Sequence, residues 1–203
     1  MARPAQTARS ERTREALRRA ALVRFLAQGV EDTSAEQIAA DAGVSLRTFY
    51  RHFASKHDLL FADYDAGLHW FRNALAGRPP TEPVIESVQA AIFAFPYDVD
   101  AVTQIASLRS SELDPDRIVR HTRQVETDFA EAVAEHLERR LPSADGADAS
   151  MHVAITARCI AAAVFTAMET WMLGDDRSLA ELARMCKIAL GWLAAGDAMF
   201  RQY

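Results

Sequence analysis

The sequence predicts an all-α protein of about nine helices, and three observations lead to this fold class. Apolar residues recur three and four positions apart through most of the 203 residues, which is the spacing that gathers them on one face of a helix. Runs that alternate apolar and polar residues with the period of a strand are missing from the sequence. The 7 prolines and 8 glycines are too few for a sandwich or barrel with many turns.

The amino-terminal third of the sequence carries four predicted helices, over about residues 10–28, 33–43, 45–53 and 55–75. Gly29 is expected to end the first helix in a left-handed conformation. Thr33 and Glu36 have the spacing of a capping box, in which each side chain satisfies a free amide at the start of the second helix. Gly43 ends this helix, and Ser45 caps the third directly afterwards.

The rest of the sequence carries five further predicted helices, over about residues 84–95, 99–113, 115–141, 151–173 and 178–195. The segment 76–83 is rich in proline and is the best candidate for a break between sub-regions. Asp114 and Pro115 open the clearest helix, because aspartate caps and proline has no amide to lose in the first turn. Pro142 ends that helix, and 142–150 is expected to be a mobile loop.

Charge is unevenly distributed along the chain. Residues 1–60 carry 10 Lys and Arg against 7 Asp and Glu, whereas the whole chain has a net charge of −5. A basic amino-terminal segment followed by an acidic remainder is typical of a protein that binds a polyanion with one end. A basic amino-terminal tail is also common in proteins that bind no nucleic acid, so the charge alone does not decide.

Composition excludes several classes of protein. Two cysteines cannot build a disulfide framework or a closed zinc site. The amino terminus lacks the apolar segment of a signal peptide, and the longest uninterrupted apolar run, 159–165, is far shorter than a membrane span. We therefore expect a cytoplasmic protein that does not enter a membrane.

Residues 33–57, TSAEQIAADAGVSLRTFYRHFASKH, have the layout of a helix-turn-helix. Two separately capped short helices are joined by Ala42-Gly43-Val44-Ser45, where glycine permits the sharp turn and Val44 fills the space between the helices. The second helix of such a motif enters the major groove of DNA, where arginine reads guanine, and hydroxyls and lysine hold phosphates. The candidate DNA-binding residues are Ser45, Leu46, Arg47, Thr48, Tyr50, Arg51, His52 and Lys56.

The run I38-A39-x-x-A42-G43-V44-S45-x-x-T48-x-Y50-x-H52-F53-x-x-K56-x-x-L59 resembles the amino-terminal domain of TetR/AcrR-type transcriptional regulators. The resemblance covers about residues 11–62 in specific detail. It implies an all-helical homodimer, usually a repressor, that binds palindromic double-stranded DNA and is released by a small ligand. It implies a helix-turn-helix DNA-binding domain at 1–55 and a helical regulatory and dimerisation domain at 56–203.

The resemblance also implies roles for single residues. Thr48, Tyr50 and Lys56 would contact phosphates, and Leu46 and Arg47 would face base edges, with Arg51 as a further candidate. Phe49 and Phe53 are interpreted as core residues. The arginines between residues 9 and 19 could add DNA contacts or could equally form a solvated helix face.

The last two predicted helices are more apolar than a single exposed stripe requires. Residues 151–173 include 17 apolar residues among 23, so this helix must be covered on nearly all sides. A four-helix bundle between two protomers would provide this cover, and burial in the core of one protomer is the alternative. The candidate dimer-interface residues are Val164, Met168, Trp171, Leu182 and Leu190.

A pocket for a small, mostly apolar effector is expected among the aromatic residues of the middle of the chain. The candidates are Trp70, Phe71, Phe93, Phe95, Tyr97, His121 and Phe129. Each of these residues could instead be plain core, and His121 could lie on the surface.

Motifs of the common enzyme classes are missing, among them phosphate-binding glycine loops, HExxH and GxSxG. No glutamate is followed three residues later by a histidine, as a helical di-iron centre requires. We therefore expect no enzyme, no cofactor and no metal. The competing interpretation is a helical small-molecule-binding or protein-interaction module that no longer binds DNA, and the joint presence of Arg47, Tyr50 and Lys56 argues against it.

Overall fold

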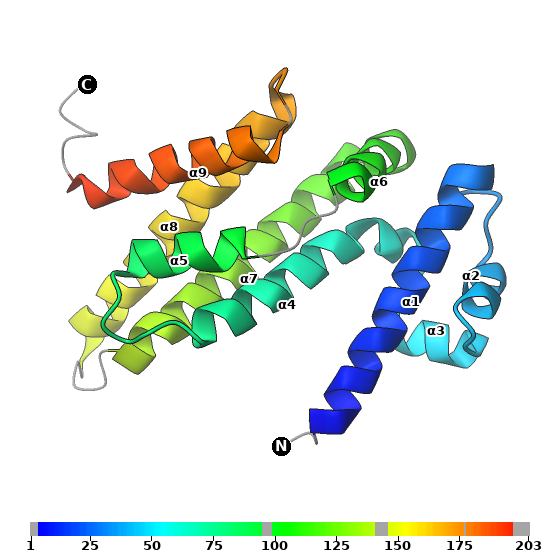
Figure 1. Cartoon of the computed structure of the whole chain (residues 1–203), viewed down its shortest axis with the longest axis horizontal. Helices are drawn as coiled ribbons and strands as arrows, with labels where there is room; N and C mark the ends of the chain where they lie inside the picture. Colours follow the sequence, from blue (N-terminus) through cyan, green and yellow to red (C-terminus); the bar gives the residue numbers. More distant parts are fainter. Residues whose placement is uncertain (1–3, 95–98, 141–145, 177, 197–203) are drawn as a thin grey trace. The chain divides into compact units, whose positions relative to one another are not determined.

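The computed structural model describes residues 4–94, 99–140, 146–176 and 178–196, and within these ranges the chain forms helices and no strands (Figure 1). This confirms the prediction of an all-α fold. The helices, in chain order, are α1 (Pro4–Gln28), α2 (Ala35–Asp41), α3 (Leu46–His52), the 3₁₀ helix η1 (Lys56–Phe61), α4 (Ala62–Ala76), α5 (Val84–Phe93), α6 (Val99–Glu112), α7 (Pro115–Arg140), α8 (Ala147–Leu173) and α9 (Leu179–Ala194).

The chain divides into two compact units. Unit 1 comprises Met1–Tyr64 and Asp98–Val119, and unit 2 comprises Asp65–Tyr97 and Arg120–Tyr203. Unit 1 therefore holds α1, α2, α3, η1 and α6, and unit 2 holds α5, α8 and α9. The functional division expected between 1–55 and 56–203 stays a prediction.

The core of unit 1 is built from apolar side chains that α1, α2, α3 and η1 each contribute. Leu17 and Phe25 of α1 are buried, as the four-residue spacing of the sequence predicts. They pack in one cluster with Ile38 of α2, Phe49 of α3 and Leu60 of η1. This cluster fixes α2 and α3 against α1, which runs beside them in Figure 1.

The start of α2 differs from the prediction by one residue. Ser34 caps the helix: its Oγ accepts from the amide of Gln37 at 3.2 Å, and Oε1 of Gln37 accepts from the amide of Ser34 at 2.9 Å. The prediction that Thr33 and Glu36 form the capping box is therefore wrong. The Thr33 side chain is buried, and its hydroxyl donates instead to the carbonyl of Gly29 at 2.7 Å, at the end of α1.

Three other boundaries also differ from the sequence prediction. The first helix begins at Pro4 rather than near residue 10. The fourth begins as the 3₁₀ turn η1, where Asp58 accepts from the amide of Ser55 at 2.9 Å, before α4 continues. The prediction of a mobile loop over 142–150 is wrong for its last part, because α8 starts at Ala147. Residues 142–145 lie outside the described residues.

Unit 2 is organised around the long helix α8 and its neighbour α9, which lie side by side (Figure 1). Nε1 of Trp171 near the end of α8 donates to the carbonyl of Ser178 at 3.0 Å and closes the turn between the two helices. By length and composition α8 is apolar enough to cross a membrane, a test that buried core helices also pass. Ile160, Val164 and Phe165 of α8 are buried inside the protein, so the apolar character of α8 has a structural explanation.

An ion-pair network joins the segment before α5 to the end of α7. Glu82 pairs with Arg78, and its Oε2 accepts from the Ser87 hydroxyl at 2.6 Å. Arg140 donates from Nε to the carbonyl of Pro80 at 2.8 Å and from Nη2 to the carbonyl of Glu82. The hydrogen bonds from Arg78 and Ser87 lower the pKa of Glu82 to about 2, so the carboxylate stays charged through the physiological range.

Candidate nucleic-acid interface

The turn between α2 and α3 has the geometry of a helix-turn-helix. Gly43 has φ +67°, in the left-handed region where a residue without a Cβ carries no strain. The backbone reverses direction after Gly43, and the amide of Val44 donates to the carbonyl of Ala39 at 2.9 Å. Val44 packs against the core of unit 1. The predicted roles of Gly43 and Val44 are therefore confirmed.

A bidentate ion pair holds α2 against α1. Nε of Arg24 lies 2.6 Å from Oδ2 of Asp41, and Nη2 of Arg24 lies 3.0 Å from Oδ1. The hydrogen bonds from Arg24 lower the pKa of Asp41 below its ordinary value. Together with the buried Ile38 and Ala39, this pair fixes the helix that would cross the DNA backbone.

The first turn of α3 is fixed by its own hydroxyl groups. Oγ of Ser45 accepts from the amide of Thr48 at 3.2 Å and lies 2.9 Å from the Thr48 hydroxyl. This satisfies one free amide at the start of the helix and orients both hydroxyls. The Ser45 side chain thus has a structural role as a cap, whether or not it also meets DNA.

One face of α3 presents cationic and aromatic side chains to solvent. Arg47, Tyr50 and Arg51 are exposed, and their spacing of three and four residues places them together on the helix surface. Tyr50 is 54% exposed although its ring packs in a T-shaped arrangement against that of Phe49, with 5.2 Å between centroids. Phe49 and Phe53 are buried, which agrees with their interpretation as core residues.

Three predicted DNA contacts of α3, Leu46, Thr48 and His52, are less exposed than expected, because each is half-buried. Leu46 is half-buried and packs against the core of unit 1. His52 is also half-buried, and its Nε2 is covered. Burial lowers the pKa of His52, with further lowering from the charges of Arg51 and Arg14. Their selection as DNA contacts rested on the interpretation that they stand exposed on α3, and this interpretation is wrong for Leu46, Thr48 and His52, since only part of each residue is exposed.

Lys56 lies beside a partner that the sequence analysis missed. Its Nζ donates to the main-chain carbonyl of Glu31 at 2.9 Å and lies 3.8 Å from Oε2 of the same residue. Oε1 of Glu31 lies 3.0 Å from Nε2 of His57. The hydrogen bond with His57 and the charge of Lys56 lower the pKa of Glu31. The two residues are 25 positions apart, and no local sequence signal joins them.

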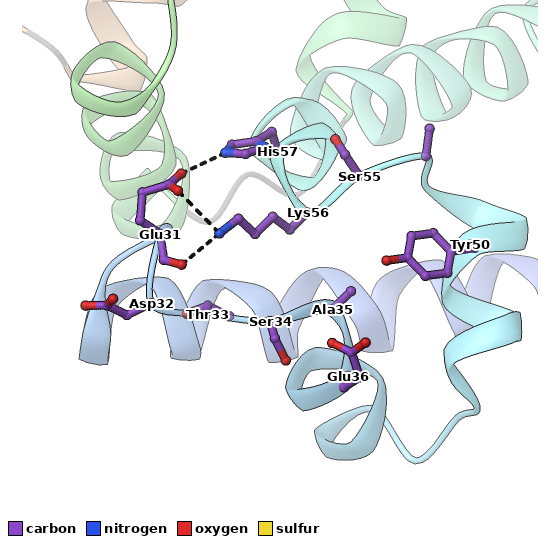
Figure 2. A pocket seen from close by; sticks show the side chains of 11 residues that line it. Glu31, Asp32, Thr33, Ser34, Ala35, Glu36, Tyr50, Ser55, Lys56 and His57 are labelled. Carbon is purple, nitrogen blue, oxygen red and sulfur yellow. Dashed lines mark hydrogen bonds and ion pairs between the residues drawn. The ribbon is translucent and has the colours of Figure 1, made fainter.

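Glu31, Lys56 and His57 stand at one end of an open hollow of about 440 Å³ in unit 1 (Figure 2). Tyr50 lies on the other side of this hollow, and the N-cap Ser34 and the exposed Glu36 lie between them. The complete lining consists of Glu31, Asp32, Thr33, Ser34, Ala35, Glu36, Tyr50, Ala54, Ser55, Lys56 and His57. Two of the three predicted phosphate contacts, Tyr50 and Lys56, thus border the same hollow.

The aromatic residues predicted to line an effector pocket lie in different surroundings. Phe71 and Phe129 are buried and stack with 4.0 Å between ring centroids, and Phe165 meets Phe129 edge-on. Trp70 and Phe93 are exposed by 39% and 44%. The remaining candidates are His121, which is half-buried, and Phe95 and Tyr97, which lie outside the described residues.

The residues predicted to form a dimer interface mostly face the interior of one chain. Val164, Trp171 and Leu190 are buried within the protomer, so the structure places them in its core. Met168 and Leu182 are half-buried. The large hydrophobic side chains that the described parts of α8 and α9 leave exposed are Met151, Ile155, Leu173, Ile188 and Trp192.

Within the described residues, no group of three or more histidine, cysteine, aspartate or glutamate side chains is arranged to hold a metal ion. Burial raises the pKa of the Cys186 thiol to about 11, which leaves it protonated and a poor nucleophile.

The fold and this site define a helix-turn-helix protein, and comparisons with known proteins specify the family. The sequence profile of "Bacterial regulatory proteins, tetR family" matches residues 17–62. The HTH-type transcriptional regulator TcmR of Streptomyces glaucescens is 34% identical over 145 residues, which cover 68% of this chain and 62% of that relative. The segment 17–62 therefore belongs to the TetR family of bacterial regulatory proteins, and the chain spans 62% of the length of TcmR.

Solved structures have the same fold. SmeT, the repressor of the multidrug efflux pump SmeDEF of Stenotrophomonas maltophilia, is 23% identical with a TM-score of 0.55, covering 90% of this chain and 89% of SmeT. SmeT has also been solved in complex with triclosan. Thermus thermophilus FadR, a TetR-family transcriptional repressor in complex with lauroyl-CoA, is 21% identical with a TM-score of 0.53, covering 90% of this chain and 94% of FadR.

Proposed function

We propose that this protein is a cytoplasmic, homodimeric transcriptional repressor that binds a palindromic operator and leaves it when a small, mostly apolar ligand binds. The observation that carries the proposal is the face of α3, where Arg47, Tyr50 and Arg51 are exposed together. A helix-turn-helix presents this face to the major groove. Arginine there can form two hydrogen bonds to guanine, while Tyr50 and Lys56 border the path of the backbone.

Dimerisation is proposed through the exposed apolar side chains of α8 and α9. Ile155 is 54% exposed, and Trp192 is 57% exposed. Several large apolar side chains exposed on two neighbouring helices are typical of a contact with another protein. A second copy of the same chain would cover them across a two-fold axis and would supply the second recognition helix that a palindrome needs.

Ligand release is proposed for unit 2. Two repressors with this fold have been solved with triclosan and with lauroyl-CoA. In this chain, the aromatic cluster of Phe71, Phe129 and Phe165 supplies an apolar interior that rearranged side chains could open. A ligand that favours a DNA-incompetent conformer tenfold would shift the equilibrium by about 1.4 kcal/mol.

The experiment that tests the proposal is a mobility-shift assay with the DNA immediately upstream of the gene. We expect the protein to bind this duplex more tightly than a scrambled duplex of the same composition, with an affinity that falls as salt rises. Deleting the gene should raise transcription of the neighbouring gene. Equal affinity for the two duplexes would contradict specific operator binding.

A thermal-shift screen of apolar metabolites, followed by titration with and without the bound duplex, tests the ligand. Linkage requires the operator to weaken the affinity of a true effector by the factor that the effector weakens DNA binding. A compound with the same affinity in both titrations is not the effector.

A further inference from the structure

We propose that Glu31 sets the DNA affinity of this protein through Lys56: its carboxylate occupies the Lys56 ammonium in the free protein, and a DNA phosphate must replace it. This inference rests on the proposed function, because DNA is the partner that Lys56 would meet. It assigns a role to a residue outside the helix-turn-helix, in the loop between α1 and α2. Glu31 acts on DNA only through Lys56 and is therefore a positioning residue.

Geometry supports an exchange at the Lys56 ammonium. Nζ has a short bond of 2.9 Å to the Glu31 carbonyl and a longer contact of 3.8 Å to the Glu31 carboxylate. The side chain of Lys56 is 19% exposed, whereas that of Glu31 is 73% exposed. The main-chain carbonyl can therefore continue to hold Nζ while the carboxylate moves into solvent. A lysine ammonium has three donors, so one of them can turn to a phosphate.

His57 gives the carboxylate a second partner. Its Nε2 lies 3.0 Å from Oε1 of Glu31, and 26% of the His57 side chain is exposed. The dashed contacts in Figure 2 run from Glu31 to both Lys56 and His57. When a phosphate takes the ammonium, Glu31 can retain the contact with His57. The exchange then loses one long ionic contact and leaves the short ones in place.

The negative charge of Glu31 links this exchange to the affinity of the protein for DNA. The neighbouring His57 and Lys56 lower the pKa of Glu31, so its carboxylate is ionised at neutral pH. A phosphate that binds Lys56 must replace the attraction between this carboxylate and the ammonium, whose atoms lie 3.8 Å apart. Opposite unit charges about 4 Å apart in a water-rich setting attract strongly enough that giving up this contact reduces an affinity about fivefold. The effect should carry no sequence preference, because phosphates are the same in every duplex.

The test measures binding of fluorescein-labelled duplexes to the full chain by anisotropy across a salt series. The probes are the DNA upstream of the gene and a scrambled duplex. Glu31→Gln keeps the size and polarity of the side chain and removes its charge. The matched control is Glu36→Gln, because Glu36 is exposed and lines the same hollow, but Figure 2 draws no contact from it to Lys56 among the residues shown.

We expect Glu31→Gln to tighten binding of both duplexes about fivefold for each bound protomer and to steepen the salt dependence. Glu36→Gln should have a clearly smaller effect. In a Lys56→Ala background, Glu31→Gln should lose most of its effect, because the ammonium through which it acts is gone. Thermal unfolding should change little, since the contact is between partly exposed groups.

Three outcomes would overturn the inference while DNA binding itself stands: unchanged affinity in Glu31→Gln, equal effects of Glu31→Gln and Glu36→Gln, or an undiminished effect in the Lys56→Ala background. Weaker DNA binding together with a lower unfolding temperature would show instead that Glu31 only supports the loop. If the unmodified chain binds neither duplex at low salt, the proposed function fails and the inference fails with it.

Discussion

Arg109 of α6 and Asp63 of α4 form a buried ion pair, with 2.6 Å between Nη2 and Oδ1 and with 5% and 12% of the two side chains exposed. Nε of Arg109 also donates to the carbonyl of Leu60 at 2.7 Å. The guanidinium lies over the ring of Tyr64, 4.4 Å from its centroid, and over that of Phe61, at 5.5 Å. The buried charge of Arg109 is thus compensated by a carboxylate, a carbonyl and two aromatic rings. These contacts hold α6 against η1 and the start of α4.

Removing the carboxylate from this pair should destabilise the protein strongly. In Asp63→Asn, Arg109 stays buried without a counter-charge, so we expect the free energy of unfolding to fall by about 3 kcal/mol. Adding Arg109→Met should recover part of the loss, because the uncompensated charge is then absent. Urea unfolding measures both variants.

The control for this pair is Glu181→Gln, which breaks the pair between Glu181 and the more exposed Arg184 of α9. A solvent-exposed contact of this kind contributes little to the free energy of unfolding. If Asp63→Asn lowered the free energy of unfolding no more than Glu181→Gln does, the buried pair would not be what holds α6 in place.

Much of unit 1 is predictable from local sequence. The burial of Leu17 and Phe25 follows from their helical spacing. The turn at Gly43 and Val44 follows from the conformations that the residues 42–45 favour. The cap of α2 was misplaced because Thr33 and Ser34 are both good caps. Only the bond from the Thr33 hydroxyl to the end of α1 decides between them.

The parts that sequence reasoning missed depend on contacts between distant residues. Glu31 meets Lys56 across 25 positions, and Arg109 meets Asp63 across 46. Spacing within one helix contains no information on such pairs. The same reason explains why buried residues were chosen as dimer-interface candidates. Both α8 and α9 are apolar on several faces, and only the packing of the helices shows that Leu190 is buried while Trp192 is exposed.

Arg47 and Lys56 should affect DNA binding in different ways. Arg47→Ala should weaken operator binding by about 1–3 kcal/mol and relax the preference at one base pair in each half-site, because arginine reads a base edge. Lys56→Ala should weaken binding to every duplex alike and lower the salt slope by about one. Anisotropy titrations over a panel of single-base operator variants separate the two effects. Unchanged affinity in both variants would show that α3 is not the recognition helix.

The dimer should dissociate when a charge is placed on the exposed apolar surface of α8 and α9. Ile155→Arg adds a charge where the side chain is 54% exposed in one protomer, so the monomer should keep its fold while the interface acquires an unpaired charge. Light scattering should report a dimer for the unmodified chain and a monomer for the variant. The comparison is Val164→Arg, which should unfold the protomer because Val164 is buried within it. A monomeric unmodified chain at micromolar concentration would contradict the prediction.

Stability should fall as the pH drops below about 6.5, and His136 of α7 is the main reason. His136 is 3% exposed. Its Nε2 lies 3.3 Å from Nη1 of Arg140, and its Nδ1 lies 3.5 Å from Nη2 of Arg139. Burial lowers the pKa of His136 most, and the charges of Arg140 and Arg139 lower it further, against smaller opposing effects of Glu82 and the carbonyl of Leu75.

The sign follows from the difference between the folded and unfolded chains. The unfolded chain takes up a proton at an ordinary histidine pKa of about 6.5, whereas folded His136 takes one up only at lower pH. Below about pH 6.5 the unfolded state therefore binds more protons, and the free energy of unfolding declines until folded His136 also protonates. His52, whose pKa burial also lowers, adds to this loss with the same sign. Each unit of difference in pKa corresponds to about 1.4 kcal/mol.

Urea unfolding at about pH 7.5 and about pH 5.5 measures this dependence. His136→Gln should reduce the difference in the free energy of unfolding between the two pH values, whatever its effect at either one, because glutamine does not titrate. The control is His152→Gln at an exposed histidine of α8, which should leave the difference as it is in the unmodified chain. If His136→Gln keeps the full pH dependence while His152→Gln reduces it, the acid sensitivity does not come from the buried histidine between the two arginines.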